Sequence, residues 1–378
     1  MNILIFSALY PPHLGGVERY AKNISYTLKE MGHNVTIATS ALYKDEGITD
    51  EHGITIYRFP CYAFLEGRMP VVRINRTFQQ MQKKLKESSY DCCMINTRFY
   101  TLSLYAARFA YKQNINSFVL DHGSAHLSFG KVVLDFIENI YEHTITWLVK
   151  RYCSRFYGVS HDSEIFLKHF HIKSEGILHN AIDVAEIKEI AQTTEYDIHK
   201  IKGIPSDAIV IAYIGRLIHR KGVLELNEAV SRLIDKYPQL YLIYAGDGEL
   251  QAQLEKQKSP HTIVLGKLQY AQAIKLMEQS DIFCLPSETE GFPTSVLEAA
   301  ACKTFIITTT AGGSKEMILN DSYGIIMNDN KPETIEKAID KAMEINYRER
   351  AVENCFKEVE NNYSWEEIAK KIVSENEY

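Results

Sequence analysis

The chain has 378 residues, of which 46% are hydrophobic and 24% charged, and its formal net charge is -6. Because this length exceeds what one hydrophobic core usually supports, the composition predicts a globular protein of two domains. The negative charge excludes a strongly basic nucleic-acid-binding protein, so no nucleic-acid partner is expected, and no apolar run approaches the roughly 18 residues of a membrane span.

The chain begins with the apolar stretch "MNILIFSALY", which lacks a basic start and a small-residue cleavage site. It therefore predicts a first β-strand rather than a signal peptide. The seven cysteines are scattered, with no C-x-x-C pair and no histidine at zinc-site spacing beside them. This usage predicts a reducing, cytoplasmic compartment and no structural metal.

Short β-branched runs alternate with longer amphipathic stretches, which is the pattern of βαβ units on parallel sheets. The strands predicted in the first half are "NILIFSA", "VTIAT", "ITIYRF", "CCMINT", "SFVLDHG" and "FYGVS". Those predicted in the second half are "AIVIAYIG", "LYLIYAG", "TIVLGKL", "IFCLPS" and "TFIITTT". We expect an α/β protein of two facing Rossmann-like, doubly wound domains, with ligands bound in an interdomain crevice beyond the carboxyl ends of the strands.

A polar stretch that begins at "HNAID" separates the two halves, and it places the hinge near Asn180–Asp183. The predicted domains cover residues 1–182 and 183–363. The segment from about 364 to 378 carries an apolar stripe of Trp365, Ile368 and Ile372. This stripe predicts a helix that packs back on the first domain.

After the first predicted strand, Gly15 and Gly16 precede a predicted helix. A glycine pair at this point lets backbone amides approach a phosphate, and the helix N-terminus adds a positive dipole. A simple tight turn is the equal alternative. The pair is not part of a G-x-G-x-x-G fingerprint, which argues against a nicotinamide cofactor.

The segment "FLEGRMPVVRINRTFQQMQKKLK" combines basic and apolar residues. Ile74, Phe78, Met81 and Leu85 recur at helical spacing. A basic amphipathic helix of this kind predicts contact with anionic membrane lipids or a lipid-linked acceptor, and an ordinary surface helix packed on its sheet is the alternative. The basic residues are Arg68, Arg73, Arg76, Lys83, Lys84 and Lys86.

Two further features of the first half have an ordinary structural explanation. His122 ends a predicted strand, where a lone histidine is more often structural than catalytic. The helix predicted over Val132–Tyr152 is apolar around much of its circumference. Burial in the core is the expected reason, with a dimer interface as the alternative.

In the second half, "GRLIHRKG" places Arg216 and Lys221 in the loop after a strand, between Gly215 and Gly222. The planar fork of donors on arginine and the mobile charge of lysine together suit a diphosphate without a metal ion. Two solvated surface cations are the alternative.

The stretch "PSETEGFPTSVLEAAAC" contains Glu290 and Glu298, eight residues apart, on either side of a predicted helix start near Thr294. Free amides and the dipole at a helix N-terminus, together with two carboxylates, suit the phosphates and hydroxyls of a nucleotide sugar. The alternative is a capping arrangement in which Thr294 caps the helix and Glu298 favours its dipole.

Taken together, "PPHLGG", "DHG", "HNAID", "GRLIHRKG", "AGDGEL" and "ETEGFPTSVLEA" resemble family 4 of the retaining GT-B glycosyltransferases. The resemblance spans nearly the whole chain in the expected order, and "GRLIHRKG" with the glutamate pair are its specific parts. Two positions depart from the common pattern: Ala181 stands where glycine is usual, and Pro293 removes one backbone donor.

The resemblance implies a nucleotide-sugar-binding second domain and an acceptor-binding first domain. Arg216 and Lys221 would hold the diphosphate and stabilise the leaving nucleotide. Glu298 would bind the ribose, Glu290 the hydroxyls of the transferred sugar near the reacting carbon, and His122 would lie beside that sugar. The other residues implied in donor binding are Gly15, Gly16, Gly291, Phe292, Thr294 and Ser295, with the nucleobase near Gly266, Lys267 and Leu268.

We therefore expect a retaining, metal-independent hexosyltransferase without a cofactor, since the sequence has no clear D-x-D motif. The expected donor is a nucleotide sugar, with UDP favoured over GDP. The expected acceptor is a glycan or a lipid-linked acceptor of surface polysaccharide or glycolipid synthesis, in the cytoplasm or peripherally at the inner face of the membrane. The alternatives are a nucleotide-sugar 2-epimerase of the same architecture and a non-catalytic nucleotide-sugar-binding subunit.

Overall fold

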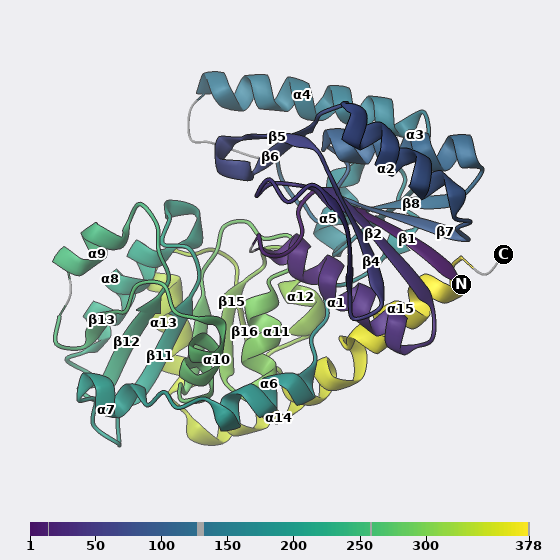
Figure 1. The fold of residues 1–378 in the computed structure, drawn as a ribbon. Coiled ribbons are helices and arrows are strands. Elements are labelled where there is room, and N and C mark those ends of the chain that lie inside the picture. The colour runs from purple at the N-terminus through teal and green to yellow at the C-terminus, as the bar shows by residue number, and fades with distance from the viewer. Residues whose placement is uncertain (14, 127–131, 258, 377–378) are drawn as a thin grey trace. The chain divides into compact units, whose positions relative to one another are not determined.

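The computed structural model describes all residues except 14, 127–131, 258 and 377–378 (Figure 1). The chain divides into two compact units. Unit 1 comprises Met1–Asn180 and Trp365–Tyr378, and unit 2 comprises Ala181–Ser364. Of the predicted C-terminal helical segment, the last two residues lie outside the described part. The helix itself, α15, spans Trp365–Ser374 and belongs to unit 1.

Unit 1 is built on an eight-stranded sheet with the order β10-β9-β8-β7-β1-β2-β4-β3. Every ladder in it is parallel except the one between β3 and β4. The strands are β1 (Asn2–Ser7), β2 (Asn34–Ser40), β3 (Gly47–Glu51), β4 (Ile54–Phe59), β7 (Cys92–Asn96), β8 (Asn116–Asp121), β9 (Arg155–Gly158) and β10 (Gly176–Ile177). A separate antiparallel hairpin pairs β5 (Cys61–Phe64) with β6 (Met69–Val72).

Helices cover both faces of this sheet, which explains why its central strands are mainly apolar. Leu4 and Phe6 of β1 point into a core cluster formed with α2 to α5, whereas α1 and α15 lie on the opposite face (Figure 1). The rings of Tyr20 in α1 and Trp365 in α15 are 5.2 Å apart. The helices are α1 (Gly16–Glu30), α2 (Arg76–Glu87), α3 (Thr101–Gln113), α4 (Val132–Lys150) and α5 (His161–His169).

Unit 2 has a six-stranded, wholly parallel sheet with the order β13-β12-β11-β14-β15-β16. The strands are β11 (Ile209–Ile214), β12 (Leu240–Ala245), β13 (Thr262–Val264), β14 (Ile282–Leu285), β15 (Phe305–Thr309) and β16 (Ile325–Met327). The helices are α6 (Val184–Thr193), α7 (Ile198–Lys202), α8 (Val223–Leu233), α9 (Gln251–Lys256), α10 (Tyr270–Glu278), α11 (Thr294–Ala301), α12 (Ser314–Met317), α13 (Pro332–Ala342) and α14 (Ile345–Asn362).

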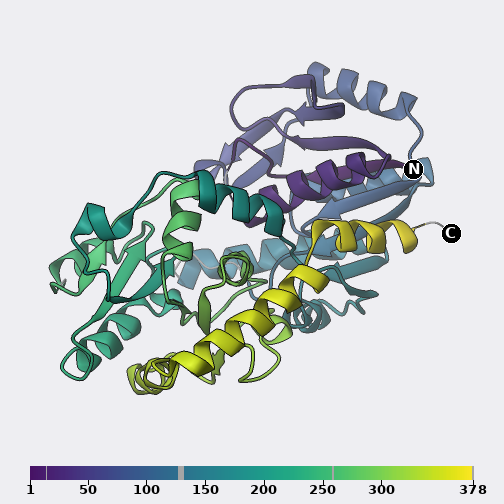
Figure 2. The same cartoon turned by 90° about the horizontal axis from the view of Figure 1, so that it is seen from below.

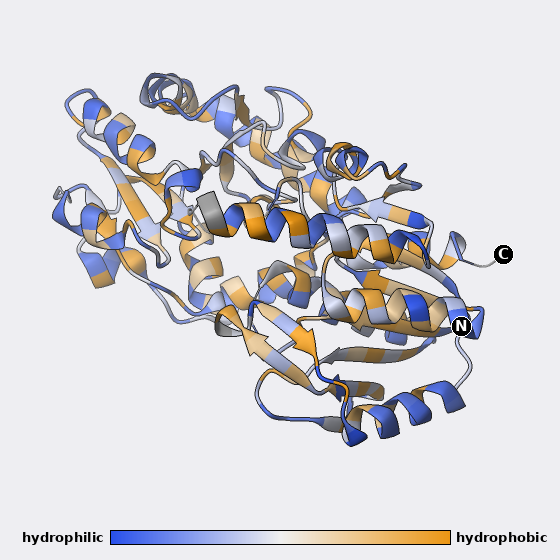
Figure 3. Ribbon diagram, turned by 90° about the horizontal axis from the view of Figure 1, so that it is seen from above, coloured by the Kyte–Doolittle hydropathy of each residue, from blue (hydrophilic) through white to orange (hydrophobic). Residues whose placement is uncertain are grey.

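The strands of both sheets are mainly hydrophobic, and the helices that cover them alternate hydrophobic and hydrophilic positions (Figure 3). All of the predicted strands are present, so the prediction of an α/β fold with parallel sheets is confirmed. The sequence prediction missed β3, β5, β6, β10 and β16. These are edge or hairpin strands of two to five residues, too short for a periodic signal.

The predicted burial of α4 is wrong for much of the helix. Phe136, Ile137, Ile140 and Trp147 are all more than half exposed, whereas Glu142 is only 1% exposed. The inward face of α4 is partly polar because it supplies carboxylates to a buried arginine described below. Among the described residues, none of the helices is long and apolar enough to cross a membrane.

Candidate functional site

The strand order of unit 2 reverses between β11 and β14, which lie next to each other at the centre of the sheet. In an open parallel sheet the loops that follow two such strands diverge and leave room for a ligand. The loop after β11 carries Arg216 and Lys221, and the loop after β14 carries Glu290. The strongest motifs of the sequence thus meet at the place where this topology binds ligands.

The loop after β11 is held in shape by backbone contacts to its neighbours. The Tyr213 hydroxyl donates to the Arg216 carbonyl at 2.8 Å, beneath the exposed Arg216 side chain. The Leu217 amide donates to the Asp247 carbonyl at 2.7 Å, which ties the loop to the "AGDGEL" turn after β12. The backbone at Arg216 is therefore positioned by the protein's own hydrogen bonds.

Gly222 brings this loop against the loop after β14. Its φ is +67°, and a Cβ atom there would lie 2.2 Å from the Pro286 carbonyl oxygen, so only glycine fits. Two residues earlier in the chain, the Arg220 carbonyl accepts a hydrogen bond of 2.9 Å from the Glu288 amide. Between these two contacts, the Lys221 ammonium group pairs with the Glu290 carboxylate.

The Lys221 and Glu290 side chains are 16% and 14% exposed, so the ion pair is largely shielded from water. The backbone at Glu290 is also fixed from behind. Gly312, with φ of +60°, lies so close that a Cβ atom there would be 2.6 Å from the Glu290 carbonyl oxygen. A cation suited to phosphate and a carboxylate suited to hydroxyl groups therefore stand side by side.

Helix α11 begins at Thr294, as predicted, with Pro293 in the capping position and no side-chain capping hydrogen bond. The alternative in which Thr294 caps the helix is therefore wrong. Glu298, one turn later, is 7% exposed. Gly291 and Ser295 flank the same junction and are half-buried, whereas the Phe292 ring is buried, 5.7 Å from the Tyr363 ring. Phe292 thus offers its backbone rather than its side chain.

The residues predicted to lie near a nucleobase follow β13, at the far edge of the same sheet. The Gly266 carbonyl accepts from the Gly246 amide at 2.8 Å, so this turn is joined to the turn after β12. Lys267 is exposed, and Leu268 packs against a hydrophobic cluster.

In unit 1, Gly15 and Gly16 stand at the N-terminus of α1, directly after the first strand and its turn. A Cβ atom on Gly15 would lie 2.4 Å from the Glu18 carboxylate, which accepts from His13 at 2.5 Å. Around Gly16, by contrast, there is open space. A Cβ atom on Gly15 would press only on the end of the flexible Glu18 side chain, whereas Gly16 leaves room for a ligand.

His122 follows β8 at the same edge of the unit 1 sheet. Its Nε2 lies 3.4 Å from the Asn96 side-chain oxygen, and its ring packs edge-on against Tyr20 at 5.0 Å. Burial lowers the pKa of His122 to about 3, so the imidazole is neutral at physiological pH. A neutral ring acts by hydrogen bonding rather than by charge.

The predicted amphipathic segment is helical from Arg76 to Glu87, but its apolar face is occupied. Phe78, Met81 and Leu85 are buried in the core of unit 1, which is the arrangement of an ordinary surface helix. Ile74, by contrast, is 73% exposed. Of the predicted basic residues, Arg73 pairs with Glu46 and is half-buried, and the exposed ones are Arg68, Arg76, Lys83, Lys84 and Lys86.

A groove of about 340 Å³ runs between α2 and α3. Three cationic side chains, those of Lys86, Arg108 and Lys112, contribute to its lining together with Phe78 and Phe109. This combination suits a ligand with an anionic group and an apolar part.

Unit 1 also contains a buried charge cluster that no motif of the sequence predicted. Arg98 is fully buried and donates to both Asp121 oxygens at 2.9 Å and also to Glu142. The Phe170 ring covers the guanidinium at 4.0 Å. Arg98 follows β7, and Asp121 ends the neighbouring strand β8. Their shared position at the carboxyl ends of two strands is the sequence signal that could have indicated the cluster.

Glu138, one turn before Glu142 on α4, is 6% exposed, and neither carboxylate oxygen has a hydrogen-bond partner among the described residues. Burial, and then the negative charge of Glu142, raise the pKa of Glu138 from 4.5 to about 7. Because the folded state favours the protonated form, Glu138 costs stability increasingly as the pH rises from 4.5 to 7.

Replacing Glu138 with glutamine should therefore raise the Tm at pH 8 and change it little at pH 4.5. Thermal unfolding across this range measures the difference. Glu30→Gln, at an exposed position on α1, serves as the control and should show no such trend. A Glu138→Gln variant that is equally or less stable than the parent at pH 8 would contradict the assignment.

Comparison with known proteins agrees with this geometry. Residues 14–186 match the model of "Glycosyltransferase Family 4", and residues 195–358 match that of "Glycosyl transferases group 1". An uncharacterised glycosyltransferase of Methanocaldococcus jannaschii is 26% identical over 388 residues, covering 98% of this chain and 97% of the relative. One of the subunits of phosphatidylinositol N-acetylglucosaminyltransferase from Arabidopsis thaliana is 24% identical, covering 98% of this chain and 80% of the relative.

Among solved structures, Anabaena HepE in complex with UDP has a TM-score of 0.75 at 17% identity, with 99% of both chains covered. At this identity the likeness shows the fold, which is GT-B. The two family matches together leave only short stretches of the chain uncovered. The chain therefore belongs to family 4 of the GT-B glycosyltransferases.

Proposed function

We propose that the protein is a retaining hexosyltransferase that uses a nucleotide sugar, with UDP preferred over GDP, and needs no metal ion at the donor. The observation that carries this proposal is the contact between Lys221 and Glu290 where the strand order of unit 2 reverses. The family supports sugar transfer, and structural neighbours named as complexes with UDP and with UDP-glucose support a uridine nucleotide.

The chemical task is to stabilise the negative charge that develops on the departing nucleoside diphosphate. In the proposal, Arg216 and Lys221 meet the diphosphate, and the N-terminus of α11 adds its dipole and the amides of Thr294 and Ser295. Such preorganised donors supply the positive charge that a metal ion supplies in other transferases. The leaving phosphate, still bound to them, then helps to deprotonate the acceptor on the same face.

The carboxylates bind hydroxyl groups in this proposal. Glu290 holds the transferred sugar, and its pairing with Lys221 fixes both side chains before the donor arrives. Glu298 binds the ribose from inside α11. In unit 1, Gly16 gives a phosphate room to approach, and neutral His122 donates or accepts a hydrogen bond at the sugar.

The acceptor assigned to unit 1 is a glycan or a lipid-linked acceptor. The cationic groove between α2 and α3 and the exposed apolar residues of α4 support a lipid with an anionic headgroup. The name of the Arabidopsis relative includes the word phosphatidylinositol, and this supports the same class of lipid acceptor. We accordingly propose a cytoplasmic protein that associates peripherally with the inner membrane face, which co-sedimentation with anionic and neutral liposomes tests.

Thermal unfolding with a panel of nucleotides tests the donor site. UDP, GDP, ADP, NAD, UDP-sugars and GDP-sugars are each added without metal. A ligand at 100 times its Kd stabilises the folded state by about 2.7 kcal/mol, so UDP and one UDP-sugar should raise the Tm by several degrees.

Two variants sharpen this test. Glu298→Gln should reduce the shift caused by UDP, because the ribose loses a charged acceptor. Glu288→Gln, an exposed neighbour in the loop after β14, should leave the shift unchanged. A shift with NAD alone, or none with any nucleotide sugar, would refute the proposed function.

A further inference from the structure

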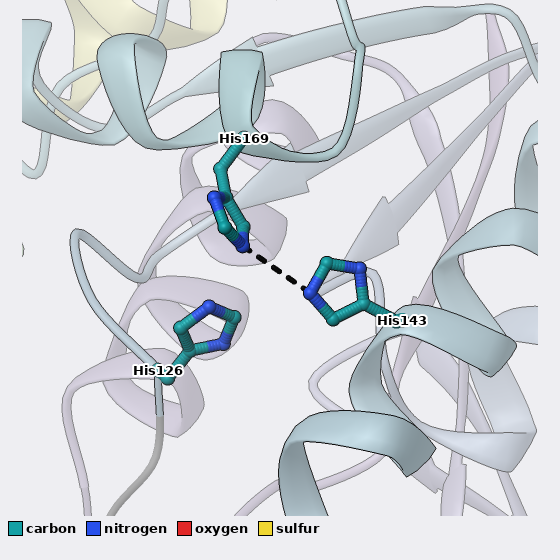
Figure 4. A group of neighbouring side chains, drawn as sticks. All are labelled: His126, His143 and His169. Carbon is teal, nitrogen blue, oxygen red and sulfur yellow. Dashed lines mark hydrogen bonds between the residues drawn. The ribbon is translucent and has the colours of Figure 1, made fainter.

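Three histidines from separate elements of unit 1 point toward one another (Figure 4). His126 lies in the segment after β8, His143 in α4, and His169 is the last residue of α5. The Nε2 atoms of His143 and His169 are 3.2 Å apart, and one ring nitrogen from each histidine lies within 4.8 Å of the others. These residues play no part in the donor site proposed above.

The distances approach those of a bound metal ion. Zinc binds imidazole nitrogen at about 2.0–2.1 Å, so two ligands of a tetrahedral site are about 3.3–3.4 Å apart. The separation of 3.2 Å between His143 and His169 is close to this value. Since the ring nitrogens lie within 4.8 Å of one another, His126 needs to approach the pair by at most about 1.5 Å to complete a three-ligand set, a shift within the reach of side-chain rotation.

A buried carboxylate orients the third ligand. His126 Nδ1 lies 2.5 Å from a Glu142 oxygen, and the other Glu142 oxygen accepts from Arg98. Glu142 is 1% exposed, so its position is fixed. A carboxylate on one ring nitrogen places the proton there and leaves the other nitrogen as the metal ligand, which is the usual support of a metal-binding histidine.

The charges around the cluster also favour a cation. The buried set behind His126 contains one guanidinium, that of Arg98, and two carboxylates, those of Asp121 and Glu142.

We propose that His126, His143 and His169 bind one divalent transition-metal ion, with Zn²⁺ the best match to three imidazoles and an open fourth position. The ion would tie α4 and α5 to the segment after β8, four residues beyond His122. It would therefore position the loop that carries His122 rather than take part in the transfer itself.

The competing explanation is that the three rings simply pack with Phe166 and Phe170, whose centroids lie 5.1 and 5.6 Å from that of His126. Ring packing would tolerate replacement of a histidine by another flat or polar side chain. A metal site would lose its ligand and with it its spectrum.

Co²⁺ is the probe, because its tetrahedral complexes absorb visible light far more strongly than the hydrated ion does. Titration of the full chain, freed of metal by dialysis against a chelator, should give a saturable band at one Co²⁺ per chain, which Zn²⁺ abolishes. The double variant His143→Gln, His169→Gln should lose this band. His161→Gln, an exposed histidine on α5 outside the cluster, should keep it.

Failure of the double variant to fold would leave His126→Gln as the test, because its ring contributes from a loop, and circular dichroism establishes which variants are folded. Absence of a saturable band in the parent chain, or an equal band in the folded variants, would overturn the proposal. The spectrum is independent of sugar transfer, so its outcome is separate from that of the proposed function.

The metal site changes how a chelator experiment must be interpreted. EDTA would remove a structural ion and lower activity even if the donor needs no metal. In the double variant, which lacks the site, EDTA should leave the remaining activity unchanged. A further loss of activity there would contradict metal-independent transfer and not the histidine site.

Discussion

Replacing Lys221 with alanine is expected to lower kcat/KM for sugar transfer by roughly 10²–10³-fold, the usual effect of removing one preorganised donor from a developing negative charge. The structure holds this ammonium group between two backbone contacts, at Arg220 and Gly222, and pairs it with Glu290. The variant therefore removes a fixed charge that water replaces poorly. The rate is measured as release of nucleoside diphosphate from the nucleotide sugar that raises the Tm in the thermal-unfolding panel.

The matched control is Arg220→Ala. Arg220 is exposed and adjacent to Lys221, and its hydrogen bond to the loop after β14 is made by its backbone carbonyl, which alanine keeps. Its loss should change kcat/KM only a fewfold. Equal effects of the two variants would show that the loop needs only general positive charge. A Lys221→Ala enzyme of near-normal activity would remove Lys221 from the mechanism.

Because alanine at position 221 also leaves Glu290 largely shielded without this partner, stability must be measured in parallel. Adding Glu290→Gln to Lys221→Ala separates the two effects. The second substitution should restore stability that the Glu290 carboxylate costs once its Lys221 partner is gone, but it should not restore turnover, since both proposed donor contacts are then altered.

Replacing Arg98 with methionine is expected to lower the free energy of unfolding by roughly 3–5 kcal/mol, because it leaves two buried carboxylates without their common cation. Asp121 is fully buried and Glu142 is 1% exposed, so neither regains water easily. Urea unfolding of the parent and the variant measures the loss. Adding Asp121→Asn and Glu142→Gln should recover part of it, since the uncompensated charge then disappears.

Arg58→Met is the control for this experiment. The Arg58 side chain is also buried, at 9% exposure, but its partners Asp45 and Glu51 are 37% and 40% exposed. These carboxylates remain hydrated after the substitution, so the loss should be far smaller. Similar losses for the two arginines would mean that packing of the side chain, and not the buried charge, dominates at position 98.

The sequence predicted those features of the fold that depend on local pattern. Long β-branched runs such as "NILIFSA" and "AIVIAYIG" are strands because parallel sheets covered on both faces need apolar residues at every position. Once these strands are located, the loops that follow them are located as well. The pairing of Lys221 with Glu290 was beyond reach, because it depends on β11 lying beside β14, and strand order is a tertiary property.

Helix α4 shows a different limit. Its composition is apolar enough to predict a core helix, but composition does not reveal which face packs. Arg98 recruits Glu142 from a position 44 residues later, and this turns a polar face inward and leaves Phe136 and Ile140 outside. The histidine cluster is hidden similarly, since its members are separated in sequence and come together only through three elements.

Helix α15 has a consequence for biosynthesis. Unit 1 is interrupted in sequence by Ala181–Ser364, and α15 follows α14 after only two residues (Figure 2). A ribosome that adds roughly 5–20 residues per second needs on the order of 10–40 s to make the intervening segment. During this time Tyr20 of α1 lacks its ring contact with Trp365, and Arg155 lacks its hydrogen bond to Asn376.

The nascent first unit therefore exposes the surface that α15 covers in the finished chain, because its sheet is complete long before that helix exists. A stop codon just before Trp365 would spare every proposed donor-binding residue of unit 2 and still leave unit 1 unfinished.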